Sequence, residues 1–252
     1  MGLELFTINT KNRYNDTIKL LAILFMIIDH IGAVFFPDVI IYRIIGRISF
    51  PLFAYQLTIG FKHTSNVNKY LLRLWIFALI SQVPFTLLFD TTNLNIFFTL
   101  FLALFLLKMI DKKEYAWIFP IGIISELINV DYGMYGILLI LLFYLFEDKK
   151  LNLFISFLIL NVFSIKFLKF PIIQIFSMLS LSIIYYKDFL PSLSLNKKVS
   201  YFIYPGHLML FLIISTLKWQ KSLVANYQLL YNTLKLLNYI FARLPLLLLM
   251  DS

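Results

Sequence analysis

The sequence contains no cysteine, which excludes disulfides, S-palmitoylation and a cysteine nucleophile. Charged residues are scarce, at 14% of the 252 residues, and the acidic ones are the rarer, with 13 against 22 basic residues. Glycine and proline are also few, with 8 of each, and they do not cluster into a linker. We therefore predict a single domain over residues 1–252.

Apolar residues make up 61% of the chain, phenylalanine alone occurs 27 times, and the mean hydropathy is +0.86. A soluble domain of this size could not bury so much apolar surface. In lipid, backbone groups must bond within their own segment, so each spanning segment should be a helix. The sequence predicts an all-α polytopic membrane bundle of about nine or ten transmembrane helices. The nine clear spans lie near residues 18–36, 44–61, 70–89, 95–110, 115–130, 134–146, 151–168, 171–186 and 200–217.

The end of the chain, residues 222–252, is ambiguous. Its apolar stretch near 229–250 carries Lys235, Arg243 and Pro245. It is either a last transmembrane helix or a helix that lies in the membrane interface.

The basic residues alternate in density along the predicted loops. With a cytoplasmic N-terminus, fourteen of the 22 fall on the inner side: Lys11, Arg13, Lys19, Lys62, Lys69, Arg73, Lys108, Lys112, Lys113, Lys149, Lys150, Lys187, Lys197 and Lys198. This asymmetry is the positive-inside pattern of a multi-pass cell-membrane protein. The net charge of +9 therefore reports topology, and we expect the lipid bilayer, not nucleic acid, to be the partner.

Asp29 and His30 stand near the far end of the first apolar run. An ionisable pair at membrane depth costs several kcal/mol unless it is partnered, so by default it marks a functional site. Lys19 lies eleven residues before His30. On a regular helix the two side chains then point in directions that differ by about 20° around the axis, and they lie about 16 Å apart along it, so both are on one face.

The first two spans form a hairpin that turns around Pro37 and Asp38. Asp29 lies nine residues before Asp38 and Arg47 nine after it, so both should lie at a similar depth. We predict that Asp29 pairs with Arg47, which leaves the imidazole of His30 free. The charge pair would either belong to a catalytic site or only fix the hairpin.

A basic cluster lies at the predicted inner end of the second span. It contains Lys62 and His63, followed by Lys69 and Arg73. The segment is either an interfacial loop that caps the next helix or a phosphate site formed by cations and helix-start N–H groups.

Four further polar residues are candidates for a substrate site. His207 follows Pro205 and Gly206, which should bend the ninth span. Asn95 is typical of a helix–helix hydrogen bond. Asp131 and Tyr132 indicate a tight outer turn, which could also roof a site. The three histidines lie far apart in a chain without cysteine, so we predict no metal site.

Taken together, these segments resemble the TraX family between about residues 17 and 217. The matching stretches are Lys19-Leu-Leu-Ala, Met26-Ile-Ile-Asp29-His30-Ile-Gly32, Arg43-x-x-Gly46-Arg47-Ile-Ser49-Phe50-Pro51-Leu-Phe53-Ala, Lys69-Tyr70-Leu-Leu-Arg73-Leu, Ser81-Gln82-Val-Pro84-Phe, Leu94-Asn95-Ile-Phe-Phe-Thr, Asp131-Tyr132-Gly133-x-x-Gly136 and Tyr204-Pro205-x-His207.

The resemblance implies a multi-pass acyltransferase, since the founding TraX activity is N-terminal acetylation of pilin in conjugation. The family is also similar to a wider group of membrane acyltransferases that acetylate surface sugars and carry Arg, ten residues, then His in the first helix. Lys19 and His30 stand at those two positions. Lys19 keeps the charge but lacks the bidentate fork of arginine. The implied donor is acetyl-CoA, and the acceptor is a pilin-like N-terminal amine or a surface glycan.

On this interpretation the acetyl-CoA phosphates meet Lys19, Lys62, His63, Lys69 and Arg73 at the inner face. His30 acts as a base or as a covalent acyl relay, and Arg47, Asn95 or an N–H of a bent helix stabilises the oxyanion. The alternative is a small transporter or proton-coupled permease in which Asp29, His30 and Arg47 form an ion relay. A third hypothesis is a membrane scaffold whose buried charges only fix helix packing.

Overall fold

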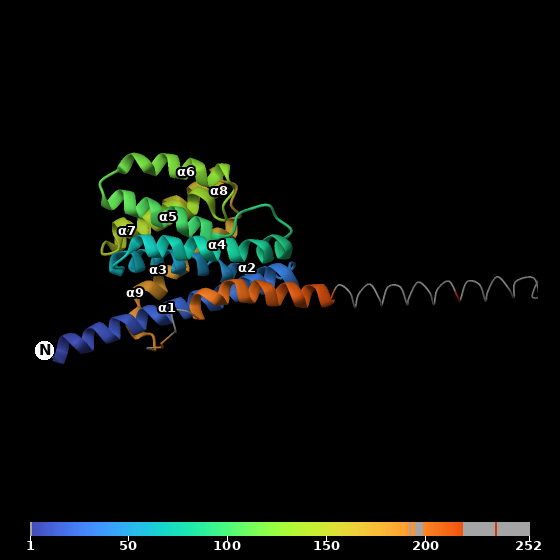
Figure 1. Ribbon diagram of the computed structural model, residues 1–252, viewed down its shortest axis with the longest axis horizontal. Coiled ribbons are helices and arrows are strands. Elements are labelled where there is room, and N and C mark those ends of the chain that lie inside the picture. The colour runs from blue at the N-terminus through green and yellow to red at the C-terminus, as the bar shows by residue number, and fades with distance from the viewer. Residues whose placement is uncertain (1, 192, 195–198, 219–234, 236–252) are drawn as a thin grey trace, which may run out of the picture. The chain divides into compact units, whose positions relative to one another are not determined.

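The computed structural model describes residues 2–191, 193–194, 199–218 and 235, with side chains from residue 16 onward. Residues 1–209 and 210–252 form two compact units, and the single domain stays a prediction. The described helices follow one another along the chain (Figure 1) as α1 Gly2–Phe35, α2 Ile40–Gly46, α3 Ser49–His63, α4 Val67–Phe89, α5 Ile96–Asp111, α6 Ile118–Leu127, α7 Gly133–Phe146, α8 Lys150–Phe167, α9 Ser180–Tyr185 and a further helix Val199–Lys218. Short 3-10 turns occupy Tyr115–Trp117, Ile172–Leu179 and Lys187–Phe189.

The all-α membrane-bundle class is confirmed. Within the described ranges, five helices are long and apolar enough to cross a bilayer: Asp16–Phe35, Ile40–His63, Val67–Phe89, Lys150–Phe167 and Val199–Lys218. Each coincides with one predicted span.

The other predicted spans fall on shorter helices. The windows near 95–110, 115–130, 134–146 and 171–186 contain α5, α6, α7 and the pair formed by the Ile172–Leu179 turn and α9. Hydropathy counts apolar residues but does not register turns: Asn129 and Tyr132 adopt left-handed φ values of 51° and 62° and separate α6 from α7. The ambiguous stretch 229–250 lies outside the described residues except for Lys235.

The second span is broken between α2 and α3. Pro51 lies in the first turn of α3, and a proline ring clashes with the carbonyl four residues earlier, here that of Arg47. The regular α-helix is therefore interrupted at Arg47 and Ile48, whose N–H groups still bond to the carbonyls of Arg43 and Ile45, and it resumes at Ser49. This break gives Arg47 a position between two helices, where its side chain can turn into the bundle.

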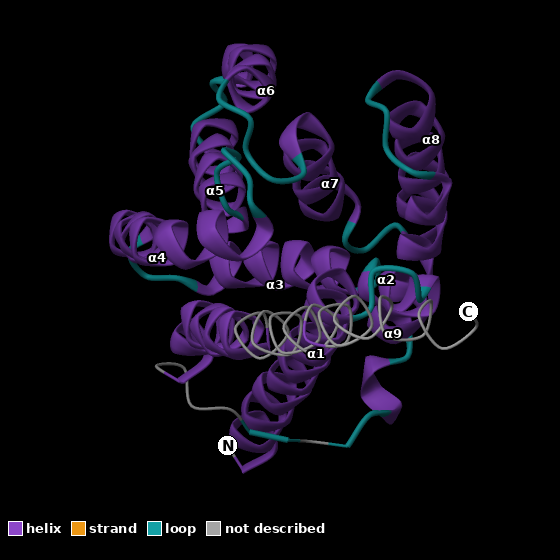
Figure 2. Ribbon diagram, turned by 90° about the vertical axis from the view of Figure 1, so that its right-hand side faces the viewer, coloured by secondary structure: helices purple, strands orange, loops and turns teal. Residues whose placement is uncertain are grey.

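The core of residues 1–209 is built around α7, which packs against α3, α5, α6 and α8. Figure 2 shows α7 between α5 and α8. The side chains of Tyr135 and Phe143 on α7 are fully buried. On the other side of α3, α1 packs against α2 and α3. The N-terminal hairpin and the α7 layer are therefore joined through α3.

Two asparagines cap neighbouring helices. The Oδ1 of Asn66 accepts a hydrogen bond from the Lys69 N–H at 2.9 Å at the start of α4, as the interpretation of this segment as a capping loop expects. The Oδ1 of Asn95 accepts from the Phe97 N–H at 3.0 Å at the start of α5. Both amide hydrogens of Asn95 are also used, towards the Ala78 carbonyl at 2.7 Å and the Gln82 Oε1 at 2.9 Å. Both amide hydrogens of Asn95 therefore bond to α4, which is the helix–helix contact expected of this residue, and we assign it no role at an oxyanion.

Candidate functional site

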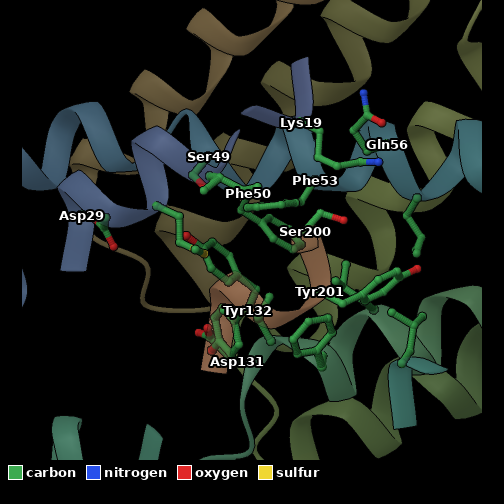
Figure 3. A pocket seen from close by; sticks show the side chains of 18 of the residues that line it. Lys19, Asp29, Ser49, Phe50, Phe53, Gln56, Asp131, Tyr132, Ser200 and Tyr201 are labelled. Atoms are coloured by element: carbon green, nitrogen blue, oxygen red, sulfur yellow. The ribbon is translucent and has the colours of Figure 1, made fainter. Parts of the chain in front are cut away.

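A cavity of about 1080 Å³ runs through the unit formed by residues 1–209. Along α1 its lining extends from Asp16 to Ala33, about 25 Å at 1.5 Å per residue. That length approaches the roughly 30 Å of a bilayer's hydrocarbon core. Figure 3 shows Lys19 and Asp29 on opposite sides of this cavity, with Phe50 and Tyr132 between them. One continuous space therefore connects the two ends of the predicted functional face of α1.

One end of the cavity is basic and aromatic. Its lining includes Lys19, His63 and Arg73, as predicted for a phosphate site, together with Tyr70 and Tyr201. The Arg73 guanidinium lies 5.3 Å from the centre of the Tyr70 ring and 5.9 Å from that of Tyr201. Such cation–π contacts orient the guanidinium while leaving its N–H groups available.

The other two predicted phosphate ligands lie elsewhere. Neither Lys62 nor Lys69 is among the residues that line the cavity. Lys62 instead forms an ion pair of 2.5 Å with Glu147 at the start of the α7–α8 loop. The sequence analysis grouped these lysines with His63 because they are near it in the chain. Successive side chains at a helix end point in different directions, so His63 can line the cavity while Lys62 does not.

At the other end of the cavity, Asp29 is held by two arginines. Its Oδ2 accepts from the Arg43 Nη1 at 2.8 Å and its Oδ1 from the Arg47 Nη2 at 3.3 Å. The predicted Asp29–Arg47 pair is confirmed, and Arg43 is a partner that the sequence reasoning missed. Arg43 precedes Arg47 by four residues, so the i, i+4 spacing on one helix face was the available signal.

Gly46 makes this approach possible, because a Cβ at that position would overlap the Asp29 side chain. The same carboxylate makes no hydrogen bond to His30 within the described part of the chain, which is consistent with the 100° between neighbouring helical residues. Asp29 and His30 are therefore adjacent in sequence but belong to separate polar contacts.

Arg47 also joins a buried hydrogen-bond network. Its Nη1 donates to the Gln174 Oε1 at 3.4 Å, and the Gln174 Nε2 donates to the Tyr135 hydroxyl at 2.9 Å. Asn161 accepts a hydrogen bond from Ser177 at 3.0 Å beside that hydroxyl. Gln174, Tyr135, Asn161 and Ser177 have no exposed surface. A satisfied network of this kind fixes the position of the guanidinium.

His30 lines the cavity, but its imidazole is not free as predicted. Its Nδ1 lies 2.7 Å from the Nε2 of His207, and the planes of the two rings differ by 18° with centroids 5.0 Å apart. Edge contacts to Phe89 at 5.1 Å and Tyr204 at 6.4 Å surround the ring. The structure thus brings together two histidines that are 177 residues apart in the sequence.

Asp131 and Tyr132 line the cavity, in agreement with the prediction that this turn roofs a site. The Asp131 N–H donates to the Leu94 carbonyl at 2.8 Å, and its carbonyl accepts from the Thr99 hydroxyl. Tyr132 stacks on Phe50 with ring centres 4.1 Å apart. Burial raises the pKa of the Asp131 carboxyl to about 6, although the nearby Arg47 charge opposes this shift.

Comparison with known proteins places the chain in a family. The profile described as TraX protein matches residues 14–215, most of the chain. The chain belongs to the TraX family. The chain is 30% identical over 154 residues to a probable fimbrial assembly protein, FimC of serogroup H1, from Dichelobacter nodosus; the match covers 53% of this chain and 63% of that protein. It is 39% identical over 89 residues to an uncharacterized protein of Rickettsia prowazekii (strain Madrid E), 34% of each chain.

The chain thus spans between about one third and just under two thirds of the length of these two relatives. No solved structure matches it.

Proposed function

We propose that this TraX-family chain is a membrane-embedded acetyltransferase. It transfers an acetyl group from cytoplasmic acetyl-CoA to an amine or hydroxyl acceptor at or across the membrane, with the N-terminus on the cytoplasmic side. The observation that carries the proposal is the single cavity that connects the basic end at Lys19 and Arg73 with the imidazole of His30.

The basic end suits the donor. Lys19, which also pairs with Asp16 at 3.7 Å, and Arg73 are cations that line the cavity, and phosphates of CoA are anions that such groups bind by charge-assisted hydrogen bonds. His63 lies beside them. The distance of about 16 Å along α1 between Lys19 and His30 is one that an extended pantetheine arm can bridge. We assign no donor contact to Lys62 or Lys69, because neither lines the cavity.

The chemistry follows from the position of His30. As a base, His30 takes the proton from the acceptor amine or hydroxyl while that atom attacks the thioester carbonyl, and the CoA thiolate leaves. As a covalent relay, its ring nitrogen attacks the thioester carbonyl and the CoA thiolate leaves. The acceptor amine or hydroxyl then attacks the acetyl-imidazole and takes the acetyl group, while the acceptor's proton passes to the released imidazole. Arg47 lines the same cavity and is held by Gln174, so it is our candidate for oxyanion stabilisation.

The contacts of Asp29 favour this function over the ion relay. A relay needs groups that exchange protons along a chain, whereas the Asp29 carboxylate is bonded to two guanidinium groups and not to His30 within the described residues. For the acceptor, we infer a pilin-like N-terminal amine, supported by the family and by the fimbrial relative from Dichelobacter nodosus.

The experiment uses the full chain, purified into nanodiscs, with radiolabelled acetyl-CoA. Peptides with free and with blocked N-termini and a polysaccharide serve as acceptors. His30→Ala should lower transfer by about 10²- to 10⁴-fold while CoA binding measured by calorimetry stays intact, because a base or relay acts on the barrier. Near-normal transfer by His30→Ala would exclude the mechanism.

Donor binding is tested separately. Lys19→Ala should weaken CoA binding, and the loss should be larger at low salt, because salt screens a partly exposed phosphate contact. Lys108→Ala is the matched control, since Lys108 bonds to Asn68 and does not line the cavity. Equal effects of the two lysine changes would place the donor elsewhere.

A further inference from the structure

The contact between His30 and His207 links two transmembrane segments through their ring nitrogens. His207 is 7% exposed and lies on the helix Val199–Lys218, while His30 lies on α1. The 2.7 Å separation between the Nδ1 of His30 and the Nε2 of His207 is that of a hydrogen bond. One of the two nitrogens must therefore carry the proton and the other must accept it.

The backbone decides which nitrogen donates. The other ring nitrogen of His207, Nδ1, lies 2.9 Å from the carbonyl oxygen of Ile203, one helical turn earlier. A carbonyl only accepts, so this Nδ1 must carry a hydrogen. A neutral imidazole has one N–H, which leaves the Nε2 of His207 with a lone pair. The Nδ1 of His30 is therefore the donor in the contact between the rings.

We propose that His207 is a positioning residue, which holds His30 in the tautomer with hydrogen on Nδ1 and so leaves Nε2 as its basic or nucleophilic nitrogen. The catalytic consequence rests on the proposed function. Two hydrogen bonds in series fix this tautomer: His30 donates to His207, and His207 donates to the Ile203 carbonyl. Because a carbonyl oxygen can only accept, the direction of both bonds is set.

The orientation of the rings supports the same assignment. The planes of the two rings differ by 18°, and the Tyr204 ring contacts both imidazoles edge-on, at 6.4 Å from His30 and 5.4 Å from His207. These contacts restrict rotation of the His30 ring about its Cβ–Cγ bond, which would otherwise put the Cδ2 carbon in the place of Nδ1 and break the bond to His207. The position of the lone pair on the Nε2 of His30 is thus fixed both by the hydrogen bond to His207 and by the orientation of the His30 ring.

The sequence makes a direct test practical, because the chain has only three histidines. Nitrogen NMR of the full chain labelled with ¹⁵N-histidine distinguishes protonated from bare ring nitrogens, and His30→Gln and His63→Gln variants assign the signals. We expect the Nδ1 of His30 to be protonated and its Nε2 bare. A wild-type spectrum with the hydrogen on Nε2 would overturn the proposal.

The variants then test His207 itself. His207→Leu removes the acceptor, so the His30 hydrogen should move to Nε2 or distribute over both nitrogens. His207→Gln offers an amide oxygen as acceptor and should restore the Nδ1-protonated signal. His63→Gln is the matched control: the Nδ1 of His63 also lies 2.9 Å from a carbonyl four residues earlier, but it makes no contact with His30 in the described chain. An unchanged His30 signal in His207→Leu would refute the proposal.

Activity supplies the second readout. We expect His207→Leu to lower kcat by about 10²-fold or more with CoA affinity unchanged, and His207→Gln to recover most of that loss. Thermal unfolding of both variants separates misfolding from misorientation. A wild-type protein without transferase activity would refute the proposed function, while the ring-nitrogen spectra would still decide the role of His207. Full kcat in a folded His207→Leu would overturn that role.

Discussion

Replacing Asp29 by asparagine should leave one costly charge behind, that of Arg47. Arg43 lies closer to the carboxylate, at 2.8 Å against 3.3 Å for Arg47. At equal permittivity this difference changes a Coulomb energy by only about a sixth. Burial differs much more, because the Arg47 side chain is 8% exposed and that of Arg43 33%. The effective permittivity falls about fourfold from water to a buried site. Burial, and not distance, therefore decides which arginine is costly to leave unpaired.

The expected cost of Asp29→Asn is therefore about 3–5 kcal/mol, the range for an uncompensated buried charge. Adding Arg47→Gln removes that charge and should recover a large part of the loss. Adding Arg43→Gln to the same Asp29→Asn background should recover only about 0–1 kcal/mol, since a third-exposed guanidinium can reach water.

Reversible unfolding in mixed micelles, followed by tryptophan fluorescence, measures six proteins: the wild type, the single variants Asp29→Asn, Arg43→Gln and Arg47→Gln, and the two double variants. The double-mutant cycles then give the two coupling energies. Circular dichroism before unfolding confirms that each variant has native helicity. Equal recovery by Arg43→Gln and Arg47→Gln, or simple additivity in both cycles, would refute the argument that burial outweighs distance.

Three further predictions follow from single residues. Gly46→Ala should separate α1 from α2 and destabilise the protein, because the new methyl group would overlap the Asp29 carboxylate; unchanged thermal stability would contradict this. The pKa of Asp131 is raised to about 6 in the folded state, so the folded protein binds more protons between about pH 4 and 6 and stability should fall as pH rises through that window. Asp131→Asn should abolish that slope, and a retained slope would assign it to another group. A single cysteine at Lys113 should resist an impermeant thiol reagent on intact cells while one at Asp38 reacts, since the chain has no other cysteine; the reverse pattern would invert the proposed orientation.

The hairpin pair could be predicted because both partners are close in sequence to one turn. Asp29 and Arg47 lie equally far from Asp38, and helical rise converts equal spacing into equal depth. Helix interruptions such as that before Pro51 follow from the same local rules. The predicted site nevertheless did not include Arg43. One buried carboxylate has room for two guanidinium groups, and equal spacing from the turn selects only one of them.

The amino-acid sequence by itself determined the helical class, the membrane environment, the hairpin and the helix face that Lys19 shares with His30, since each depends on neighbours along the chain. Tertiary structure alone decided that His30 meets His207, that Gln174 and Tyr135 support Arg47, and that Lys62 turns towards Glu147 and not into the cavity. In a membrane protein both the lipid-facing and the core-facing sides of a helix are apolar, so hydropathy carries little information about which faces pack together. The partners of polar residues far apart in sequence are therefore fixed only when the helices pack.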